Sequence, residues 1–97
     1  MSASYAIGID FGTESGRAVL VDVADGRELA TAVHRYSNGV IDAHLPEPDE
    51  DVRLESEWAL QDPDDYLATV RDTIPRLLAD AGVSAADVVG LGIDVTA

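Results

Sequence analysis

The chain has 97 residues, with 19 acidic against 6 basic side chains and a formal net charge of −13 at pH 7. It lacks the clustered lysine and arginine that bind nucleic acid or anionic membrane surfaces, so we expect neither as a partner. It contains no cysteine, which excludes disulfides and thiolate metal sites. Residues 1–5 are too short and too polar for a signal peptide, and no apolar run reaches about 18 residues, so the cytoplasm is the expected compartment.

Three strands are expected at the start of the chain. Residues 5–10, 17–23 and 28–36 are rich in apolar and β-branched side chains, and turn residues separate them. Because connections this short join antiparallel neighbours, we expect an antiparallel meander.

The turn after the first strand carries polar groups that suggest a binding site. Asp10 ends the strand, and Gly12 and Thr13 follow it. Glycine has no Cβ to block a ligand and allows positive φ, so backbone N–H groups there can point at a phosphate. A carboxylate repels phosphate, so Asp10 would instead hold a Mg²⁺ that bridges to the phosphate oxygens. An ordinary hairpin turn is the alternative, although the tip carries more polar groups than a turn needs.

A long acidic segment follows the meander. Residues 37–61 show no sustained period and include the run P-E-P-D-E-D. Prolines and clustered acids favour a solvated loop, with an interface or active-site role as the alternative.

One helix is expected over residues 63–81. Asp62 fits its N-cap and Gly82 its C-terminal stop, and apolar residues recur between them at helical spacing. Pro75 lies inside this segment, and we expect a bend near residues 71–74 rather than two helices.

The last strand is expected over residues 88–95. It is almost wholly apolar, as is typical of a parallel strand covered on both faces. The order βββαβ predicts an α/β domain whose polar edge carries Asp10, Thr13, Asp94 and Thr96. One helix covers only one face of a sheet, so we expect this chain to be the N-terminal piece of a longer protein. A complete small domain that covers its apolar face as a homodimer is the alternative.

Three motifs in order resemble the FGGY family of sugar kinases. I-G-I-D-F-G-T-E-S-G-R-A-V-L-V-D, from residue 7, is similar to the family's first phosphate motif. W-A-L-Q-D-P-D-D-Y, from Trp58 to Tyr66, is similar to its Gln-Asp-Pro segment, and G-I-D-V-T-A, residues 92–97, resembles the strand that enters the sugar pocket. The resemblance implies the first part of the N-terminal kinase domain, a ribonuclease-H-like lobe of the actin/Hsp70/hexokinase superfamily.

The resemblance also implies a reaction. The full-length protein would transfer the γ-phosphoryl group of ATP, with Mg²⁺, to a ketopentose, and the tip most resembles the members that make L-ribulose 5-phosphate in arabinose catabolism. Residues implied for the nucleotide and metal are Asp10, Gly12, Thr13, Glu14 and Arg17, with Asp10 as the metal ligand. Residues implied for the sugar are Asp94, Thr96 and Ala97.

The resemblance leaves parts of the site to the rest of the chain. The family's general base would lie in a later segment, so we assign no catalytic residue here and expect the 97 residues alone to be inactive. Arg17 would contact phosphate or brace the loop, and an ion pair with a neighbouring acid is the alternative. His34 and His44 match no family motif, and Trp58 is expected to be a packing anchor.

Three other functions stay open at the level of sequence. One is another FGGY sugar kinase, such as a rhamnulokinase or xylulokinase. Another is a non-enzymatic ATPase-fold protein, which would share the Asp-x-Gly-Thr turn and the meander. The third is an interaction module without a nucleotide site.

Overall fold

A computed structural model describes residues 3–41, 45, 52–54 and 60–95. Its centre is a four-stranded sheet in the order β3-β2-β1-β6. The strands are β1 (Tyr5–Phe11), β2 (Ser15–Asp22), β3 (Glu28–Arg35) and β6 (Val88–Val95). The first three form an antiparallel meander, and β6 runs parallel to β1. The predicted βββαβ order and α/β class are confirmed.

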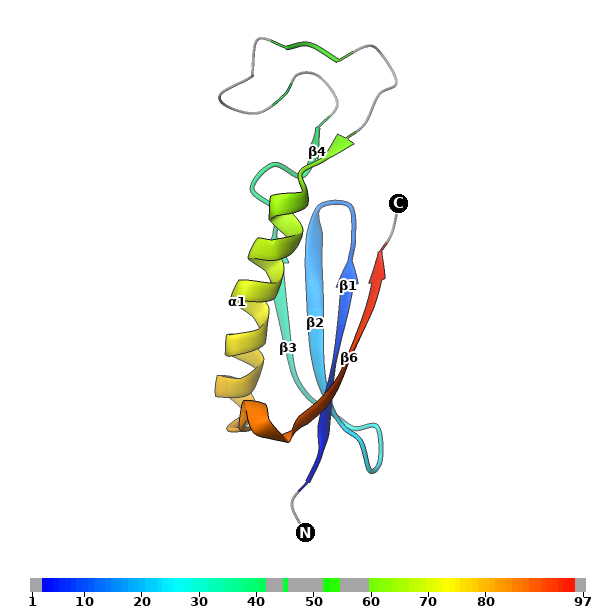
Figure 1. Cartoon of the computed structure of the whole chain (residues 1–97), viewed down its shortest axis with the longest axis vertical. Coiled ribbons are helices and arrows are strands. Elements are labelled where there is room, and N and C mark those ends of the chain that lie inside the picture. The colour runs from blue at the N-terminus through cyan, green and yellow to red at the C-terminus, as the bar shows by residue number, and fades with distance from the viewer. Residues whose placement is uncertain (1–2, 42–44, 46–51, 55–59, 96–97) are drawn as a thin grey trace.

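Helix α1 (Pro63–Ala81) lies against β2 and β3 on one face of the sheet (Figure 1). The Asp62 side chain caps its first turn by accepting a hydrogen bond from the Asp64 amide, and Gly82 ends it in the left-handed conformation at φ 66°. The helix continues through Pro75 as one element. The bend expected there stays a prediction.

The core lies between α1 and the sheet. Alternate residues of each strand face the helix, as the period of two along a strand requires. The buried apolar side chains are Ile7, Ile9, Phe11, Ala18, Leu20, Ala32, Tyr36 and Leu77.

Three short elements were not predicted from the sequence. Strands β4 (Val40–Ile41) and β5 (Leu60–Gln61) pair with each other, so the expected loop over residues 37–61 begins and ends in a small ladder. The 3-10 helix η1 (Ala85–Asp87) leads into β6, and the Ser84 side chain caps it by accepting a hydrogen bond from the Ala86 amide. Much of the acidic run between β4 and β5 lies outside the described residues.

Strand β6 is more exposed than its composition predicted. Leu91, Ile93 and Val95 are each more than half exposed, because α1 lies over β2 and β3 and does not reach the β6 edge. The parallel pairing was predicted correctly, but cover on both faces is absent from the described part of the chain. Within that part, no helix is long and apolar enough to cross a membrane.

The topology brings several segments to one end of the molecule. The upper end of Figure 1 holds the ends of β1 and β6 and the tip of the β1–β2 hairpin. The start of α1 and the β4–β5 ladder lie toward the same end. This end carries the candidate site.

Candidate phosphate and metal site

Asp10 lies at the end of β1, where the strand meets both neighbours. The ladder places it opposite Arg17 of β2 and beside Asp94 of β6. Ile9 and Phe11 on either side of it are buried, whereas Asp10 is exposed. Because successive side chains alternate between faces, Asp10 projects from the face that α1 leaves open.

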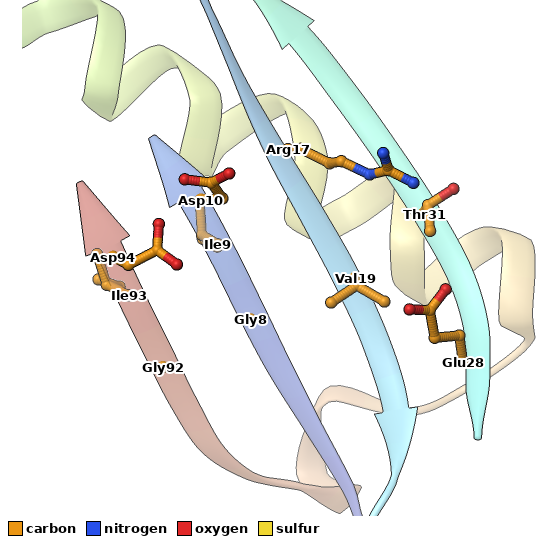
Figure 2. A pocket seen from close by; sticks show the side chains of 10 residues that line it. All are labelled: Gly8, Ile9, Asp10, Arg17, Val19, Glu28, Thr31, Gly92, Ile93 and Asp94. Carbon is orange, nitrogen blue, oxygen red and sulfur yellow. The ribbon is translucent and has the colours of Figure 1, made fainter. Parts of the chain in front are cut away.

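The carboxyl groups of Asp10 and Asp94 lie together, as Figure 2 shows. A side-chain hydrogen bond with Asp10 raises the pKa of Asp94, and burial and the negative charge of Asp10 add to the rise. Two carboxylates this close repel each other, so a proton or a cation between them is favoured. The sequence predicted that both would reach the same edge, and the structure places them in one ladder position.

An open cleft of about 370 Å³ runs along this face of the sheet. Glycines form part of its floor and leave space there because they have no side chain. An added Cβ would meet no atom within 4 Å at Gly92 and would meet Val19 Cγ1 at 3.4 Å at Gly8. Asp10, Asp94 and Arg17 line its polar end. The full lining is Gly8, Ile9, Asp10, Arg17, Val19, Glu28, Thr31, Gly92, Ile93 and Asp94.

Arg17 has its guanidinium exposed on the cleft side (Figure 2). Within the described residues it forms no ion pair, since both ion pairs found there involve Asp72. The ion-pair alternative for Arg17 is therefore not observed in the described part of the chain. Its positive charge remains available to an anion, and the phosphate role stays a prediction.

Gly12 is required by space rather than by backbone conformation. Its N–H donates to the Ser15 carbonyl over 2.9 Å, which closes the turn, and an added Cβ would lie 3.0 Å from that same oxygen. Positive φ is found at Gly26, Gly39 and Gly82 but not at Gly12. The narrow turn leaves no room for a Cβ at residue 12, so the lack of a side chain is the property of glycine that this turn uses.

The tip of the hairpin presents free backbone donors. Thr13 and Glu14 are exposed, and in the described part of the chain neither N–H has a hydrogen-bond partner. The carbonyls of Gly12 and Thr13, by contrast, accept hydrogen bonds from the side chains of Tyr36 and Gln61. Free N–H groups beside a glycine favour an anion such as phosphate.

Tyr36 was not identified from the sequence as part of this site. Burial raises the pKa of its phenol, and the nearby Tyr66, Asp65 and Asp10 raise it further. The hydroxyl therefore stays protonated near neutral pH and remains a donor to the Gly12 carbonyl. Its position in the apolar pattern of the third strand gave no sign of this contact.

Gln61 also lay outside the predicted site residues, although its Gln-Asp-Pro motif was noted. Its role depends on contacts between β5, the hairpin and α1, which are distant in sequence. Thr96 and Ala97, predicted at the sugar edge, lie outside the described residues, as do His44 and Trp58.

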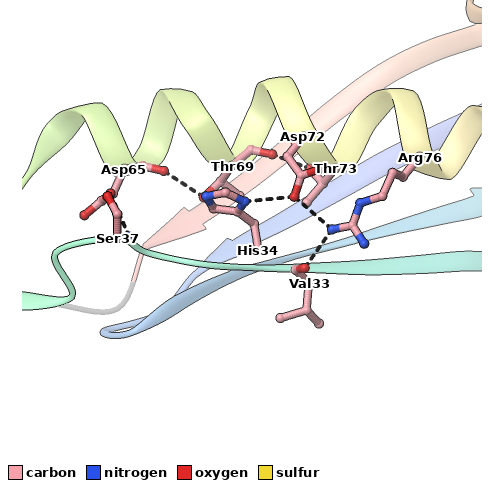
Figure 3. A network of polar contacts seen from close by, with 8 residues as sticks. All are labelled: Val33, His34, Ser37, Asp65, Thr69, Asp72, Thr73 and Arg76. Atoms are coloured by element: carbon pink, nitrogen blue, oxygen red, sulfur yellow. Dashed lines mark hydrogen bonds and ion pairs between the residues drawn. The ribbon is translucent and has the colours of Figure 1, made fainter.

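His34 takes part in a different network on the α1 side of the sheet. Its Nδ1 lies 2.8 Å from Asp72 Oδ2, and Arg76 donates to the same oxygen over 3.0 Å and to the Val33 carbonyl over 2.7 Å (Figure 3). The hydrogen bond with His34 lowers the pKa of Asp72, and the neighbouring guanidinium of Arg76 lowers it further. This network joins β3 to α1 and does not reach the cleft.

The donor set of the candidate site suits Mg²⁺. Asp10 and Asp94 offer hard carboxylate oxygens, and Mg²⁺ commonly binds one or two carboxylates and completes its shell with waters and phosphate oxygens. No cluster of three potential side-chain ligands exists among the described residues, so a site made of protein groups alone is not found there.

Curated relatives match the chain over its whole length. The ribulokinase of Halalkalibacterium halodurans is 48% identical over 97 residues, and the ribulokinase of Geobacillus thermodenitrificans is 54% identical over 97 residues. Both matches cover 100% of this chain but only 17% of the relative. The chain thus spans about a sixth of the length of these relatives. No family model matches the sequence.

Solved structures show the same fold. A gluconate kinase from Lactobacillus acidophilus superposes with a TM-score of 0.71 at 21% identity over 98% of this chain and 16% of its own. A xylulose kinase from Rhodospirillum rubrum gives a TM-score of 0.58 at 27% identity over 94% of this chain and 15% of its own. The chain therefore belongs to the FGGY family of sugar kinases, and the curated relatives that it matches over its whole length are ribulokinases.

Proposed function

We propose that this chain works as part of a kinase of its relatives' length, which transfers the γ-phosphoryl group of ATP to L-ribulose and forms L-ribulose 5-phosphate. The support for the substrate is the match to proteins named ribulokinase over all 97 residues. The chain covers 17% of them, so the general base and most of the adenine pocket are assigned to the rest of the kinase.

The pairing of Asp10 with Asp94, beside a hairpin tip with free amides, is the observation that carries this proposal. Phosphoryl transfer demands positioning and charge neutralisation from the protein. Asp10 would hold Mg²⁺, and the N–H groups of Thr13 and Glu14 would bind phosphate oxygens. A bound Mg²⁺ would neutralise charge on the phosphates.

Asp94 supports the placement of the sugar next to the nucleotide. Its ladder position adjoins that of Asp10, and neighbouring strands lie about 4.8 Å apart. The attacking hydroxyl and the phosphorus must approach to roughly 3–3.5 Å, so a sugar edge directly beside the metal edge suits the reaction. Thr96 and Ala97 are assigned to the sugar edge on the family resemblance alone.

Arg17 would provide the positive charge of the site. It lies opposite Asp10 across the β1–β2 ladder and lines the same cleft. A guanidinium can bind phosphate oxygens in a bidentate manner, which fixes orientation as well as charge.

The test is sugar-dependent release of ADP by a kinase of full family length that contains these 97 residues. L-ribulose, D-ribulose, D-xylulose, L-rhamnulose, gluconate and glycerol would be compared at equal concentration with MgATP. We expect the highest kcat/KM with L-ribulose. Preference for another sugar would reject the substrate and keep the kinase. ADP release that is independent of sugar would favour a non-kinase ATPase.

A further inference from the structure

Three consecutive carbonyl groups at the hairpin tip are bound from outside the hairpin. Tyr36 Oη donates to the Gly12 carbonyl over 2.9 Å, and Gln61 Nε2 donates to the Thr13 carbonyl over 3.1 Å. The backbone N–H of Tyr36 donates to the Glu14 carbonyl over 3.0 Å. The donors come from the residue after β3 and from β5, so segments distant in sequence converge on the three residues of the turn.

The two side-chain donors are themselves held by an aromatic cluster. The Tyr66 ring at the start of α1 lies 4.9 Å from that of Phe11 and 5.7 Å from that of Tyr36, measured between centroids. Tyr36 is only 8% exposed. Its hydroxyl therefore approaches the Gly12 carbonyl from a fixed position.

The orientation of the Gln61 amide follows from its two partners. The Thr13 carbonyl can only accept, so the NH₂ group must face it. The amide oxygen then accepts the hydroxyl of Tyr66. Gln61 is thus fixed at both ends of its amide, between α1 and the hairpin.

Binding these carbonyls determines where the free amides point. In a planar trans peptide the C=O and N–H of one peptide unit point in opposite directions. The N–H of Thr13 belongs to the same peptide unit as the Gly12 carbonyl, and the N–H of Glu14 to that of Thr13. We call the side chains of Tyr36 and Gln61 the clamp. When they hold the two carbonyls, both N–H groups are turned away from the clamp and toward a ligand.

We propose that Tyr36 and Gln61 are positioning residues for the nucleotide phosphates, because they hold the carbonyls of Gly12 and Thr13 and so orient the N–H groups of Thr13 and Glu14 toward the phosphate. Tyr66 supports the clamp through Gln61. This inference rests on the proposed kinase function, and it gives the glutamine of the Gln-Asp-Pro motif a role.

The test uses a kinase of full family length and four variants without new charge, one of which is Tyr66→Phe. Tyr36→Phe removes one hydroxyl and keeps the ring, and Gln61→Met removes both amide contacts at similar volume. Tyr5→Phe, at the opposite end of β1, is the matched control. The measurements are kcat, the KM for ATP and for sugar, the Kd for MgADP by calorimetry, and the urea unfolding midpoint.

We expect Tyr36→Phe and Gln61→Met each to raise the KM for ATP and the Kd for MgADP about three- to tenfold, as the loss of one oriented hydrogen bond implies. The KM for sugar should change less than about twofold, since the clamp acts on phosphate alone. Tyr66→Phe should show a smaller change in the same direction, and Tyr5→Phe none.

A purely structural brace would give a different result. It would lower the unfolding midpoint and change the KM for sugar and ATP together, and that outcome, or unchanged MgADP affinity, would overturn the proposal. If the parent kinase binds MgADP but no sugar stimulates turnover, the proposed function fails while the Kd values still decide the clamp. A parent that binds no MgADP would overturn both.

Discussion

Gly16 sets the distance between β2 and the helix. An added Cβ at this residue would lie 2.4 Å from Thr69 Cγ2 and 3.0 Å from Thr69 Oγ1. Thr69 is fully buried, and its hydroxyl donates to the Asp65 carbonyl one turn earlier, so it has little freedom to move. The first turn of α1, which presents Tyr66 to the clamp, therefore depends on glycine at residue 16.

Gly16→Ala should lower the free energy of unfolding by about 1–3 kcal/mol, because overpacking forces the helix or the strand to shift. Urea denaturation of the family-length kinase measures this. Adding Thr69→Ser removes Cγ2, the nearest atom, and should restore much of the loss. Gly90→Ala, where an added Cβ meets nothing within 4 Å, is the control. Equal stability of Gly16→Ala and the parent would contradict the close packing.

Local sequence patterns predicted some residues of the site and could not predict others. Asp10 and Asp94 follow from strand ends that carry the same Gly-Ile-Asp triplet, a signal contained in each strand. Tyr36 and Gln61 reach the hairpin through tertiary contacts across 24 and 48 residues of sequence. No local periodicity in the sequence indicates such contacts, so the clamp could be identified only from the structure.

At the scale of elements, α1 is joined to the strand side of the molecule at two points. Near its start, the buried Asp65 accepts hydrogen bonds from the Ser37 amide and hydroxyl over 3.2 and 3.0 Å. Two turns later, the His34–Asp72 pair joins the middle of the helix to β3 (Figure 3). These polar contacts fix the rotation of the helix on an otherwise apolar interface.

The Asp72 network predicts a pH-dependent contribution to stability. The pKa of Asp72 is held below its ordinary value of 3.8, so its folded-state pairing stabilises the protein above that pH and is lost as pH falls through the lowered value. Arg76 and the imidazole of His34 are the groups that face it. Asp72→Asn should therefore be less stable than the parent near neutral pH.

That difference should shrink as the pH falls from 3.8 through the lowered pKa of Asp72, where the parent carboxylate also becomes protonated in the folded state. Urea unfolding across an acid pH series measures it, with Asp80→Asn, an exposed acid on the same helix, as control. A stability difference between Asp72→Asn and the parent that is constant with pH would show that packing, not charge, is involved.

Elements with strong local signals were predicted closely. The helix bounds at Asp62 and Gly82 follow from capping chemistry, and the first three strands differ from the predicted ranges by one or two residues. The β4–β5 ladder was not predicted, because a strand of two residues has no period to detect. Its register brings Gln61 to the hairpin, so the missed element is also the one that completes the clamp.

At the scale of the whole molecule, one apolar row has no cover within the described residues. Leu91, Ile93 and Val95 are 53%, 57% and 57% exposed. Next to them, Ile7, Ile74 and Leu78 line a shallow apolar groove of about 250 Å³ with Leu91. The chain spans 17% of its relatives, so we propose that the rest of the kinase covers this row.

Ile93→Asp in the family-length kinase tests this cover. If the row is buried there, an unpaired carboxylate should cost several kcal/mol of unfolding free energy, about 3–5 by analogy with uncompensated buried charges. Val23→Asp, at a residue that is 53% exposed beyond the end of β2, should cost less than about 1 kcal/mol. Similar small losses of unfolding free energy in both variants would show that the row stays exposed in the family-length kinase and would contradict the proposal.

The most direct test of the account is L-ribulose-dependent release of ADP by the family-length kinase and by its Asp10→Asn variant. Asp10 is exposed, so the variant should keep the parent's circular dichroism and unfolding midpoint, while kcat falls by about two to four orders of magnitude as Mg²⁺ loses its carboxylate. Asp80→Asn should match the parent. Sugar-dependent turnover by Asp10→Asn at near the parent rate would contradict the central claim that Asp10 holds the metal beside the nucleotide phosphates.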